Sequence, residues 1–398
     1  MRIGVVAPID IGAFVSFFEY ESDKLLLEKW RVYNTAPAVT TLVKSFITAG
    51  HKVVVFTTCN NNIECKSDKI DIYATVRCDK YPQKYLWGIY DNARCLKHLI
   101  SCHINDVDVL HAHWTYEFAF SAKSFTNFVP VFCTIRDYAP YIWSIVSLKD
   151  KITWTIRRLM NWQVLRTKNV HFVANSPYTS EMIKKGFSVD TIIIPNSITN
   201  SFFDVPCSSE PSGINILCIT SNFNIRKNIV ALIKAFHLFY EKHPSAHLSI
   251  IGPYEQIRPE EMDRWQLNGW LTNVSFLGVK KHNELLHYID ECNIFVSPSL
   301  EESFGNTFIE CMSRKRTVIG GLFSGAVPYV LKNGEAGYLC DVSNPEAIKN
   351  AIDEAVEHPD VRIKKVMNAY DYVRKTFSEE VVMTLYISLF DSIVSNRS

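Results

Sequence analysis

Two glutamates that flank a glycine-containing turn carry the side chains best suited to chemistry. Glu302 stands in a polar turn after an expected strand, residues 294–296, and Glu310 follows eight positions later inside an expected helix. Carboxylates accept hydrogen bonds from sugar hydroxyls. Backbone N–H groups at a helix start can hold a phosphate, whose charge the helix dipole favours, and Gly305 allows close approach of the backbone. The segment therefore predicts a site for an anionic, sugar-containing ligand.

Each glutamate also has an ordinary interpretation. Either one alone could be a solvated residue near a helix start, with Phe304, Phe308 and Ile309 as core positions. The segment taken as a whole favours the binding site.

A basic pair follows another expected strand, residues 214–219. Arg226 and Lys227 come after a polar loop beyond that strand. A diphosphate develops charge as it leaves a sugar, and cations beside it favour the transition state over the ground state. If the anionic ligand carries a diphosphate that leaves a sugar, Lys227 is placed to bind it. For Arg226, a surface position next to the following helix is an open alternative.

Two histidines and a basic–acidic pair follow strands of the first half. His111 and His113 are two positions apart, so their side chains share one face of a strand end. Zinc is disfavoured, because no further ligand at suitable spacing accompanies them. A neutral imidazole at His113 could hydrogen-bond a sugar hydroxyl, whereas His111 is expected to be structural. Arg136 and Asp137 end the next strand, and we expect them to face the same ligand-binding cleft as His113.

Strands and helices that could position these residues alternate along the chain. The expected strands are residues 3–7, 52–57, 107–110, 131–134, 171–174, 214–219, 247–251, 274–277, 294–296, 317–319 and 337–339. The helical segments between them are residues 36–49, 91–101, 229–242, 283–290, 307–313, 326–331, 345–356 and 362–377. Continuous apolar strands alternating with helices indicate parallel sheets that are covered on both faces.

This pattern predicts an α/β chain of two Rossmann-like domains that face each other across a cleft, with ligands beyond the carboxyl ends of the strands. The length of 398 residues suits two or three domains. We expect a first domain over residues 1–196, a linker over 197–212 where Pro, Ser and Gly cluster, and a second domain over 213–377. A helix near 378–398 is expected to pack back on the first domain.

Two further segments have open interpretations. Residues 9–35 form an expected long, aromatic and acidic loop, which is either an acceptor-recognition loop or lid or an insertion without function. Residues 151–168 form a basic, tryptophan-rich amphipathic helix, in which Ile152, Ile156, Leu159 and Met160 are expected to share one face. Such a helix could lie on an anionic membrane surface, although a helix packed on the domain exterior is favoured.

Composition excludes several classes of protein. Lys+Arg 42 against Asp+Glu 41 gives a net charge of +1, so no basic field suggests nucleic acid as a partner. The 11 cysteines form no C-x-x-C pair, which favours a reduced, cytoplasmic protein. The first apolar run is too short for a signal peptide, and no stretch approaches the roughly 20 apolar residues of a spanning helix.

The segment from Glu302 to Glu310 resembles the E-x7-E motif of retaining glycosyltransferases of the GT-B fold, specifically family 4. The resemblance covers most of the chain, because further segments match in order. They are residues 108–114, 173–176, 194–197, 226–228, 250–252 and 276–278.

The resemblance implies roles for particular residues. Glu310 would bind the nucleotide ribose, Glu302 the donor sugar, and Lys227 the diphosphate, while His113 would lie near the reacting centre. The implied catalytic residues are His113, Lys227 and Glu302. The implied donor-binding residues are Asn222, Arg226, Lys227, Glu302, Ser303, Phe304, Gly305, Asn306, Thr307 and Glu310. Acceptor contacts are expected from Arg136, Asp137 and Ser176, and no metal or other cofactor is expected.

The chain departs from the family pattern at three positions. Asn222 stands where an Arg is usual, Ala326 replaces the second residue of a glycine pair, and Arg136 replaces a frequent His. Adjacent Arg226 is a candidate substitute for the missing Arg at Asn222. The missing Arg at Asn222 and the altered glycine pair also motivate a different hypothesis, a non-catalytic nucleotide-sugar sensor or scaffold. A dinucleotide dehydrogenase is disfavoured, because no G-x-G-x-x-G follows the first strand.

Activity and context follow from the resemblance as expectations. The chain would transfer a sugar, with retention of configuration, from a nucleotide-diphosphate sugar to a hydroxyl of a glycan or lipid-linked glycan. Uridine is favoured over guanosine as the base, and the leaving diphosphate would assist deprotonation of the attacking hydroxyl. The expected role is in O-antigen, capsule or exopolysaccharide synthesis, in the cytoplasm or at the cytoplasmic face of the inner membrane.

Overall fold

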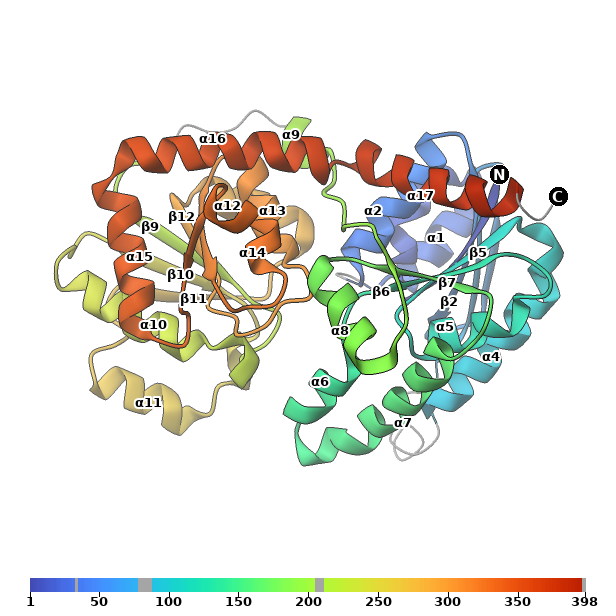
Figure 1. The fold of residues 1–398 in the computed structure, drawn as a ribbon, viewed down its shortest axis with the longest axis horizontal. Coiled ribbons are helices and arrows are strands. Elements are labelled where there is room, and N and C mark those ends of the chain that lie inside the picture. Colours follow the sequence, from blue (N-terminus) through green and yellow to red (C-terminus); the bar gives the residue numbers. More distant parts are fainter. Residues whose placement is uncertain (33–34, 78–87, 205–210, 396–398) are drawn as a thin grey trace. The chain divides into compact units, whose positions relative to one another are not determined.

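A computed structural model describes residues 1–32, 35–77, 88–204 and 211–395 (Figure 1). The chain forms two compact units, one of residues 1–197 with 379–398 and one of residues 198–378. Within the expected linker 197–212, residues 205–210 lie outside the described part of the chain, and helix α9 (Ser201–Asp204) belongs to the second unit. The expected α/β fold class is confirmed, since each unit is built on a largely parallel sheet covered by helices.

The first unit contains a sheet in the order β3-β4-β2-β1-β5-β6-β7-β8. Its strands are β1 (Arg2–Val6), β2 (Lys52–Cys59), β3 (Ile63–Lys66), β4 (Ile70–Val76), β5 (Val109–His113), β6 (Val131–Ile135), β7 (Val170–Ala174) and β8 (Ile192–Ile193). Strand β3 runs antiparallel to β4, and the other neighbours are parallel. Strands β3, β4 and β8 were not expected from the sequence.

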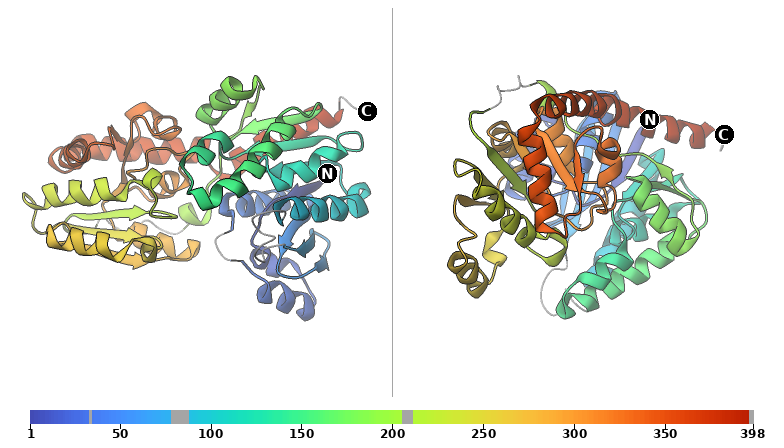
Figure 2. Two further views of the ribbon diagram at one scale, coloured as in Figure 1. Left: turned by 90° about the horizontal axis from the view of Figure 1, so that it is seen from below. Right: turned by 60° about the vertical axis from the view of Figure 1, so that its left-hand side comes forward.

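Helices cover both faces of this sheet (Figures 1 and 2). They are η1 (Ile11–Phe17), α1 (Glu21–Lys29), α2 (Pro37–Thr48), α4 (Gly88–His103), η2 (Ile104–Asp106), α5 (Glu117–Ala122), η3 (Lys123–Phe125), α6 (Ala139–Ile145), α7 (Leu148–Leu165), α8 (Pro177–Phe187) and α17 (Glu379–Ser395). One apolar core joins the sheet to η1, α1, α2 and α17, and the other joins it to α4, α5, η3, α7 and α8. Helix α17 contributes Tyr386 and Phe390, whose rings lie 6.3 and 6.0 Å from that of Phe46.

The expectation of a long loop at 9–35 is wrong for its described part. Residues 11–17 and 21–29 are helical, and Phe14, Phe18 and Leu27 are buried in the core of the first unit. Asp10 starts η1 by accepting a hydrogen bond from the Gly12 N–H. Phe14 and Phe18 therefore stabilise the unit, and the two helices leave no long loop over these residues.

The second unit has a parallel sheet in the order β11-β10-β9-β12-β13-β14. Its strands are β9 (Asn215–Ile219), β10 (His247–Ile251), β11 (Val274–Gly278), β12 (Ile294–Val296), β13 (Thr317–Gly321) and β14 (Tyr338–Cys340). Its helices besides α9 are η4 (Ile225–Lys227), α10 (Ile229–Tyr240), η5 (Tyr254–Gln256), α11 (Pro259–Leu267), η6 (His282–Glu284), α12 (Leu285–Asp290), α13 (Asn306–Ser313), α14 (Val327–Val330), η7 (Lys332–Gly334), α15 (Pro345–Glu357) and α16 (Pro359–Thr376). Helices α10, α11 and α15 share one core, and α9, α12, α13, α14 and α16 share the other.

Candidate functional site

Three loops meet at the carboxyl ends of β9, β12 and β13, which are neighbours in the second sheet. The Leu300 N–H donates a hydrogen bond to the Arg226 carbonyl at 2.8 Å, and the Ala326 N–H donates to the Glu302 carbonyl at 2.8 Å. Glu302 also forms an isolated β-bridge with Gly325. The basic pair, the turn before α13 and the altered glycine pair are therefore fixed against one another by backbone hydrogen bonds.

Two consecutive ion pairs cross between these loops. Lys227 Nζ lies 2.5 Å from Glu302 Oε1, and Arg226 Nη1 lies 3.1 Å from Glu301 Oε2. Burial alone would raise the pKa of Glu302, but Lys227 outweighs it and holds the pKa below its ordinary value. Burial raises the pKa of Glu301 although Arg226 opposes the rise. Lys227 and Glu302 thus come together as the sequence suggested, and Glu301 is a partner that it did not suggest.

The turn before α13 depends on Gly305. Gly305 is the N-cap of α13 with φ of 93°, and a Cβ atom there would lie 2.9 Å from Phe308 Cδ2. The helix therefore begins abruptly, and Asn306 and Thr307 occupy its first turn, where backbone N–H groups have no partner within the helix. The Phe304 side chain is buried against Phe377, so a ligand contact from Phe304 would come from its backbone.

Glu310 has a partner that the sequence did not reveal. Its Oε1 lies 2.8 Å from Nε2 of His282, which begins η6 after β11. Burial alone would lower the pKa of His282, but Glu310 more than offsets this and raises it above the ordinary value. The two residues are 28 positions apart, and no sequence motif links them. The sequence could have suggested the pair only through the position of His282 after a strand of the same sheet.

Asn222 is engaged locally. Its Oδ1 accepts a hydrogen bond from the Asn224 N–H, and its Nδ2 donates to Ser221 Oγ at 3.3 Å. Arg226 makes an ion pair with Glu301. Whether Arg226 takes over the role of the Arg that is missing at position 222 is not tested by this contact, so that role stays a prediction.

In the first unit, His113 ends β5 and is completely buried. The Arg136 Nε–H donates to His113 Nδ1 at 3.2 Å, and Arg136 Nη1 donates to Asn196 Oδ1 at 2.5 Å. Because Nδ1 accepts, the remaining proton of a neutral ring lies on Nε2, which is buried without a hydrogen-bond partner. Burial, reinforced by His111 and Arg136, holds the pKa of His113 well below its ordinary value. His113 is therefore a neutral donor near pH 7.

His111 has the structural surroundings expected for it. Its Nε2 lies 2.8 Å from Thr134 Oγ1, which in turn lies 3.0 Å from the Tyr386 hydroxyl of α17. Burial, with a smaller effect of Arg136, lowers the pKa of His111 to about 3. His111 thus links the sheet to the C-terminal helix.

The structure distributes the three expected acceptor residues over different surroundings. Arg136 is buried and bonded to His113, and Ser176 is the buried N-cap of α8, where its Oγ accepts from the Thr179 N–H. Asp137 accepts a short hydrogen bond from the Tyr116 hydroxyl. Asp137 alone of the three lines a cavity of about 280 Å³ at the carboxyl end of the first sheet.

That cavity combines aromatic rings with charged groups. Its lining includes Trp114, Tyr116, Glu117, Asp137, Trp154 and Arg157. Arg157 Nη2 lies 3.2 Å from Glu117 Oε1, whereas Glu117 Oε2 is buried without a hydrogen-bond partner. Trp114 has a positive φ of 61°, uncommon for a bulky residue and frequent at functional sites. The sequence did not indicate Trp114, Glu117 or Trp154 as site residues.

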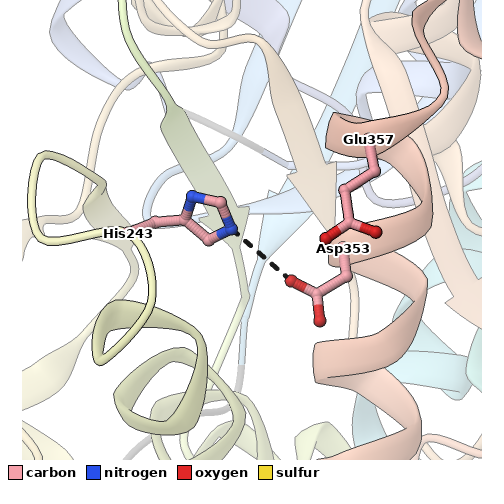
Figure 3. A group of neighbouring side chains, drawn as sticks. All are labelled: His243, Asp353 and Glu357. Atoms are coloured by element: carbon pink, nitrogen blue, oxygen red, sulfur yellow. Dashed lines mark ion pairs between the residues drawn. The ribbon is translucent and has the colours of Figure 1, made fainter.

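One group of three side chains within the described ranges could hold a metal ion (Figure 3). The ligand atoms of His243, Asp353 and Glu357 lie within 4.8 Å of one another. Lysines already neutralise both carboxylates, because Lys349 Nζ lies 2.6 Å from Asp353 Oδ2 and Lys242 pairs with Glu357. We therefore assign the group to the packing of α10 against α15, and the expectation that no metal takes part stays a prediction.

Comparisons with known proteins support the family resemblance. Residues 37–201 match the model "Glycosyltransferase Family 4", and residues 205–375 match "Glycosyl transferases group 1". The capsular polysaccharide biosynthesis glycosyltransferase CapM of Staphylococcus aureus is 24% identical over 168 residues, which are 42% of this chain and 43% of CapM. The match thus spans less than half the length of that curated relative.

Solved structures share the fold along the whole chain. Sucrose-phosphate synthase from Thermosynechococcus elongatus matches with a TM-score of 0.72 at 17% identity over 100% of both chains. Anabaena HepE, solved in complex with UDP and glucose, matches with a TM-score of 0.67 at 13% identity, covering 98% of this chain and 100% of that one. The expected family and fold are thereby confirmed, and the chain belongs to glycosyltransferase family 4, with the GT-B fold.

Proposed function

We propose that the protein transfers a sugar, with retention of configuration, from a nucleotide-diphosphate sugar to a hydroxyl of a glycan acceptor. The observation that carries the proposal is the Lys227–Glu302 pair at 2.5 Å, placed beside the start of α13. One side chain of this pair suits a phosphate and the other suits sugar hydroxyls. HepE, a protein of the same fold, was solved with UDP, which supports uridine as the base.

In the proposed reaction, the sugar–phosphate C–O bond breaks and the diphosphate leaves with the bonding electrons. The acceptor oxygen bonds to the anomeric carbon on the same face, and its proton passes to a phosphate oxygen. Lys227 and the first N–H groups of α13 stabilise the charge on the leaving group. Glu302 accepts hydrogen bonds from the donor sugar, and Glu310 from the ribose. Because Lys227 supplies a cation here, we propose that no metal or other cofactor is required.

His113 has a role that follows from its protonation state. Its Nε2–H is an available donor, and its lowered pKa keeps the ring neutral. We assign this N–H to a hydroxyl of the transferred sugar. A neutral donor suits that task, because an imidazolium would repel the positive charge that develops on a sugar ring during transfer.

The acceptor is assigned to the cavity lined by Asp137. Its indole rings, Trp114 and Trp154, offer flat apolar surfaces that suit the faces of a sugar ring, and the carboxylates of Asp137 and Glu117 can accept hydrogen bonds from sugar hydroxyls. This chemistry supports a glycan or lipid-linked glycan acceptor. CapM is named for capsular polysaccharide biosynthesis, which supports a role in O-antigen, capsule or exopolysaccharide synthesis.

Calorimetric titration with UDP-, GDP- and ADP-sugars tests the donor assignment, followed by transfer assays with the donor that binds. We expect a UDP-sugar to bind and the anomeric proton of the product to show retention by NMR. The failure of all three donor classes to bind would reject the proposal, and an inverted product would reject the mechanism.

A nucleotide-sugar sensor or scaffold is the second candidate. It is supported by Asn222, whose amide is engaged in a local turn where relatives commonly supply a cation. Tight donor binding without transfer or donor hydrolysis would favour this function.

We further propose that the first unit binds the cytoplasmic face of the inner membrane through α7. Two residues of the expected apolar face turn inward, because Met160 is buried and Ile156 is half-buried against the same cluster. The exposed apolar residues are instead Leu148, Ile152, Leu159 and Trp162. Their spacings of four, seven and three positions place them on one face of the helix. No helix in the described ranges has the length and hydrophobicity needed to span a bilayer.

Charge on the same helix matches an anionic lipid surface. Lys149 and Arg158 of α7 and Arg166 at its C-cap are exposed, and basic residues on an amphipathic helix are typical of helices that lie in the membrane interface. We expect Leu159→Glu to weaken sedimentation with phosphatidylglycerol vesicles, whereas Leu267→Glu, at an exposed leucine of α11, should not. Equal binding of both variants to the vesicles would reject α7 as the membrane-binding surface.

A further inference from the structure

His282 is the hydrogen-bond partner of Glu310, the expected ribose-binding carboxylate. Its Nε2 lies 2.8 Å from Glu310 Oε1. We propose that His282 is a positioning residue that holds Glu310 ready for the ribose and makes donor affinity depend on pH. This inference rests on the proposed donor site and adds a residue that regulates it.

The pair is shielded enough for its geometry to matter. The Glu310 side chain is 11% exposed and the His282 side chain is 30% exposed, so water screens their attraction less than it would at the surface. A carboxylate has two oxygens, and the bond to His282 engages Oε1. The second oxygen is then oriented before a ligand arrives, which reduces the ordering cost of binding.

The surrounding backbone holds His282 in place. Lys281 precedes η6 as its N-cap, and its N–H donates to Glu284 Oε2 at 2.7 Å, which fixes the first turn. The buried Phe202 ring of α9 lies 5.9 Å from the imidazole ring. His282 is therefore presented by a short, capped turn rather than by a free surface side chain.

The charged residues on His282's own segment and on the neighbouring helices α9, α12 and α13 are Lys280, Lys281 and Glu284, Asp204, Asp290, and Glu310 with Arg314 at the C-cap of α13. Arg314 is committed to Asp290, with Nη2 2.7 Å from Oδ2. Glu310 makes the ion pair with the His282 ring and is the cause of its raised pKa, against the opposing effect of burial.

The sign of the pH dependence follows from this charge. Below its raised pKa, His282 is an imidazolium that pairs with Glu310 and adds positive charge to a site for a diphosphate. As the pH rises through that pKa, the charge is lost, and the donor must bind more weakly. His113 cannot cause the same effect, because its pKa lies well below the ordinary value.

The test is the dissociation constant of UDP-glucose, which has no group that titrates between pH 6 and 8.5. For the wild type we expect it to rise about three- to tenfold over that range. His282→Gln keeps a hydrogen-bond donor without a titrating charge, and its profile should be flat. His282→Ala should weaken binding about tenfold at pH 6, because a bond to a charged group is lost.

His287→Gln is the matched control. His287 Nε2 pairs with Glu291 Oε1 at 3.3 Å in the neighbouring helix α12, and both side chains are exposed. Its profile should follow the wild type. A wild-type profile that is flat, or one that His282→Gln reproduces, would overturn the role of His282 while leaving the donor site intact. If the wild type binds no nucleotide sugar at all, the donor site itself is rejected, and the role of His282 with it.

Discussion

The two units differ in the charge of the side chains at the carboxyl ends of their sheets. In the second unit, the cations Arg226 and Lys227 face the carboxylates Glu301 and Glu302, and each pair is partly open to solvent. In the first unit, His113 is buried and neutral, and the charge of Arg136 is directed to His113 and Asn196. The second unit therefore offers charged side chains that a ligand can contact. The first unit offers a neutral hydrogen-bond donor, His113, which the buried Arg136 holds in place.

This difference separates two tasks. A diphosphate requires positive charge that increases in effect as the leaving group forms, which suits the second unit. A sugar hydroxyl is uncharged and is recognised by fixed donors, acceptors and aromatic faces, which suits the first unit. Four substitution experiments break or sharpen this comparison.

Removing the cation should have the largest effect. Lys227→Ala should lower the transfer rate by about 10²–10³, because the charge on the leaving diphosphate loses its stabilising partner. Steady-state kinetics with the donor found by titration measures this. Lys242→Ala, which removes the surface pair with Glu357, is the control and should leave the rate unchanged. A rate within twofold of wild type for Lys227→Ala would contradict the charged role of this unit.

The neutral donor should matter less. His113→Phe removes the Nε2–H while keeping a buried ring, and we expect kcat to fall about tenfold to a hundredfold with little change in donor affinity. The kcat profile of the wild type should show no step from His113 between about pH 6 and 8, because its pKa is far lower. A step in that range that disappears in His113→Phe would show a titrating residue and end the comparison.

Glycine geometry gives a third test, on stability. Gly305→Ala combines a positive φ of 93° with a Cβ contact of 2.9 Å to Phe308. Gly50→Ala in the first unit has φ of 85° and no heavy atom within 4 Å. We expect Gly305→Ala to lower the free energy of unfolding by about 1–3 kcal/mol more than Gly50→Ala, by overpacking. Urea denaturation measures the free energy of unfolding of both variants. Equal losses of stability would show that the turn before α13 can shift to accommodate a Cβ atom.

The smallest effect concerns adjacent carboxylates. The pKa of Glu302 is lowered in the folded chain, so its contribution to stability is present above its unfolded pKa and is lost as the pH falls through the folded one. The pKa of Glu301 is raised, so its contribution is present at low pH and lost as the pH rises. Near pH 7, Glu302→Gln should therefore cost about 1 kcal/mol more than Glu301→Gln. Thermal melts at pH 4 and 7 measure this, and the reverse order would contradict the assigned pairs.

Sequence patterns predicted the architecture well, because its signals are local. Buried parallel strands such as β2 and β6 are continuous β-branched runs, and the E-x7-E segment lies within one turn and one helix. Segment 9–35 was misjudged because Phe14 and Phe18 are packed by tertiary contacts with the core, which no local periodicity shows.

The site was predicted unevenly for the same physical reason. Lys227 and Glu302 were expected together because both follow strands of one sheet. The pairing of His282 with Glu310, and the cavity beside Trp154, arise from elements far apart in the sequence. The apolar face of α7 was shifted because the burial of Met160 depends on what the helix packs against.

Helix α17 is the last described element of the chain, yet it completes the core of the first unit. Residues 379–395 supply Tyr386 and Phe390 to a core whose other members precede residue 198. During synthesis the ribosome must therefore finish the entire second unit before the first can close its apolar face. We infer that the first unit stays partly open until α17 has been synthesised, so its stability depends on residues made after the whole second unit.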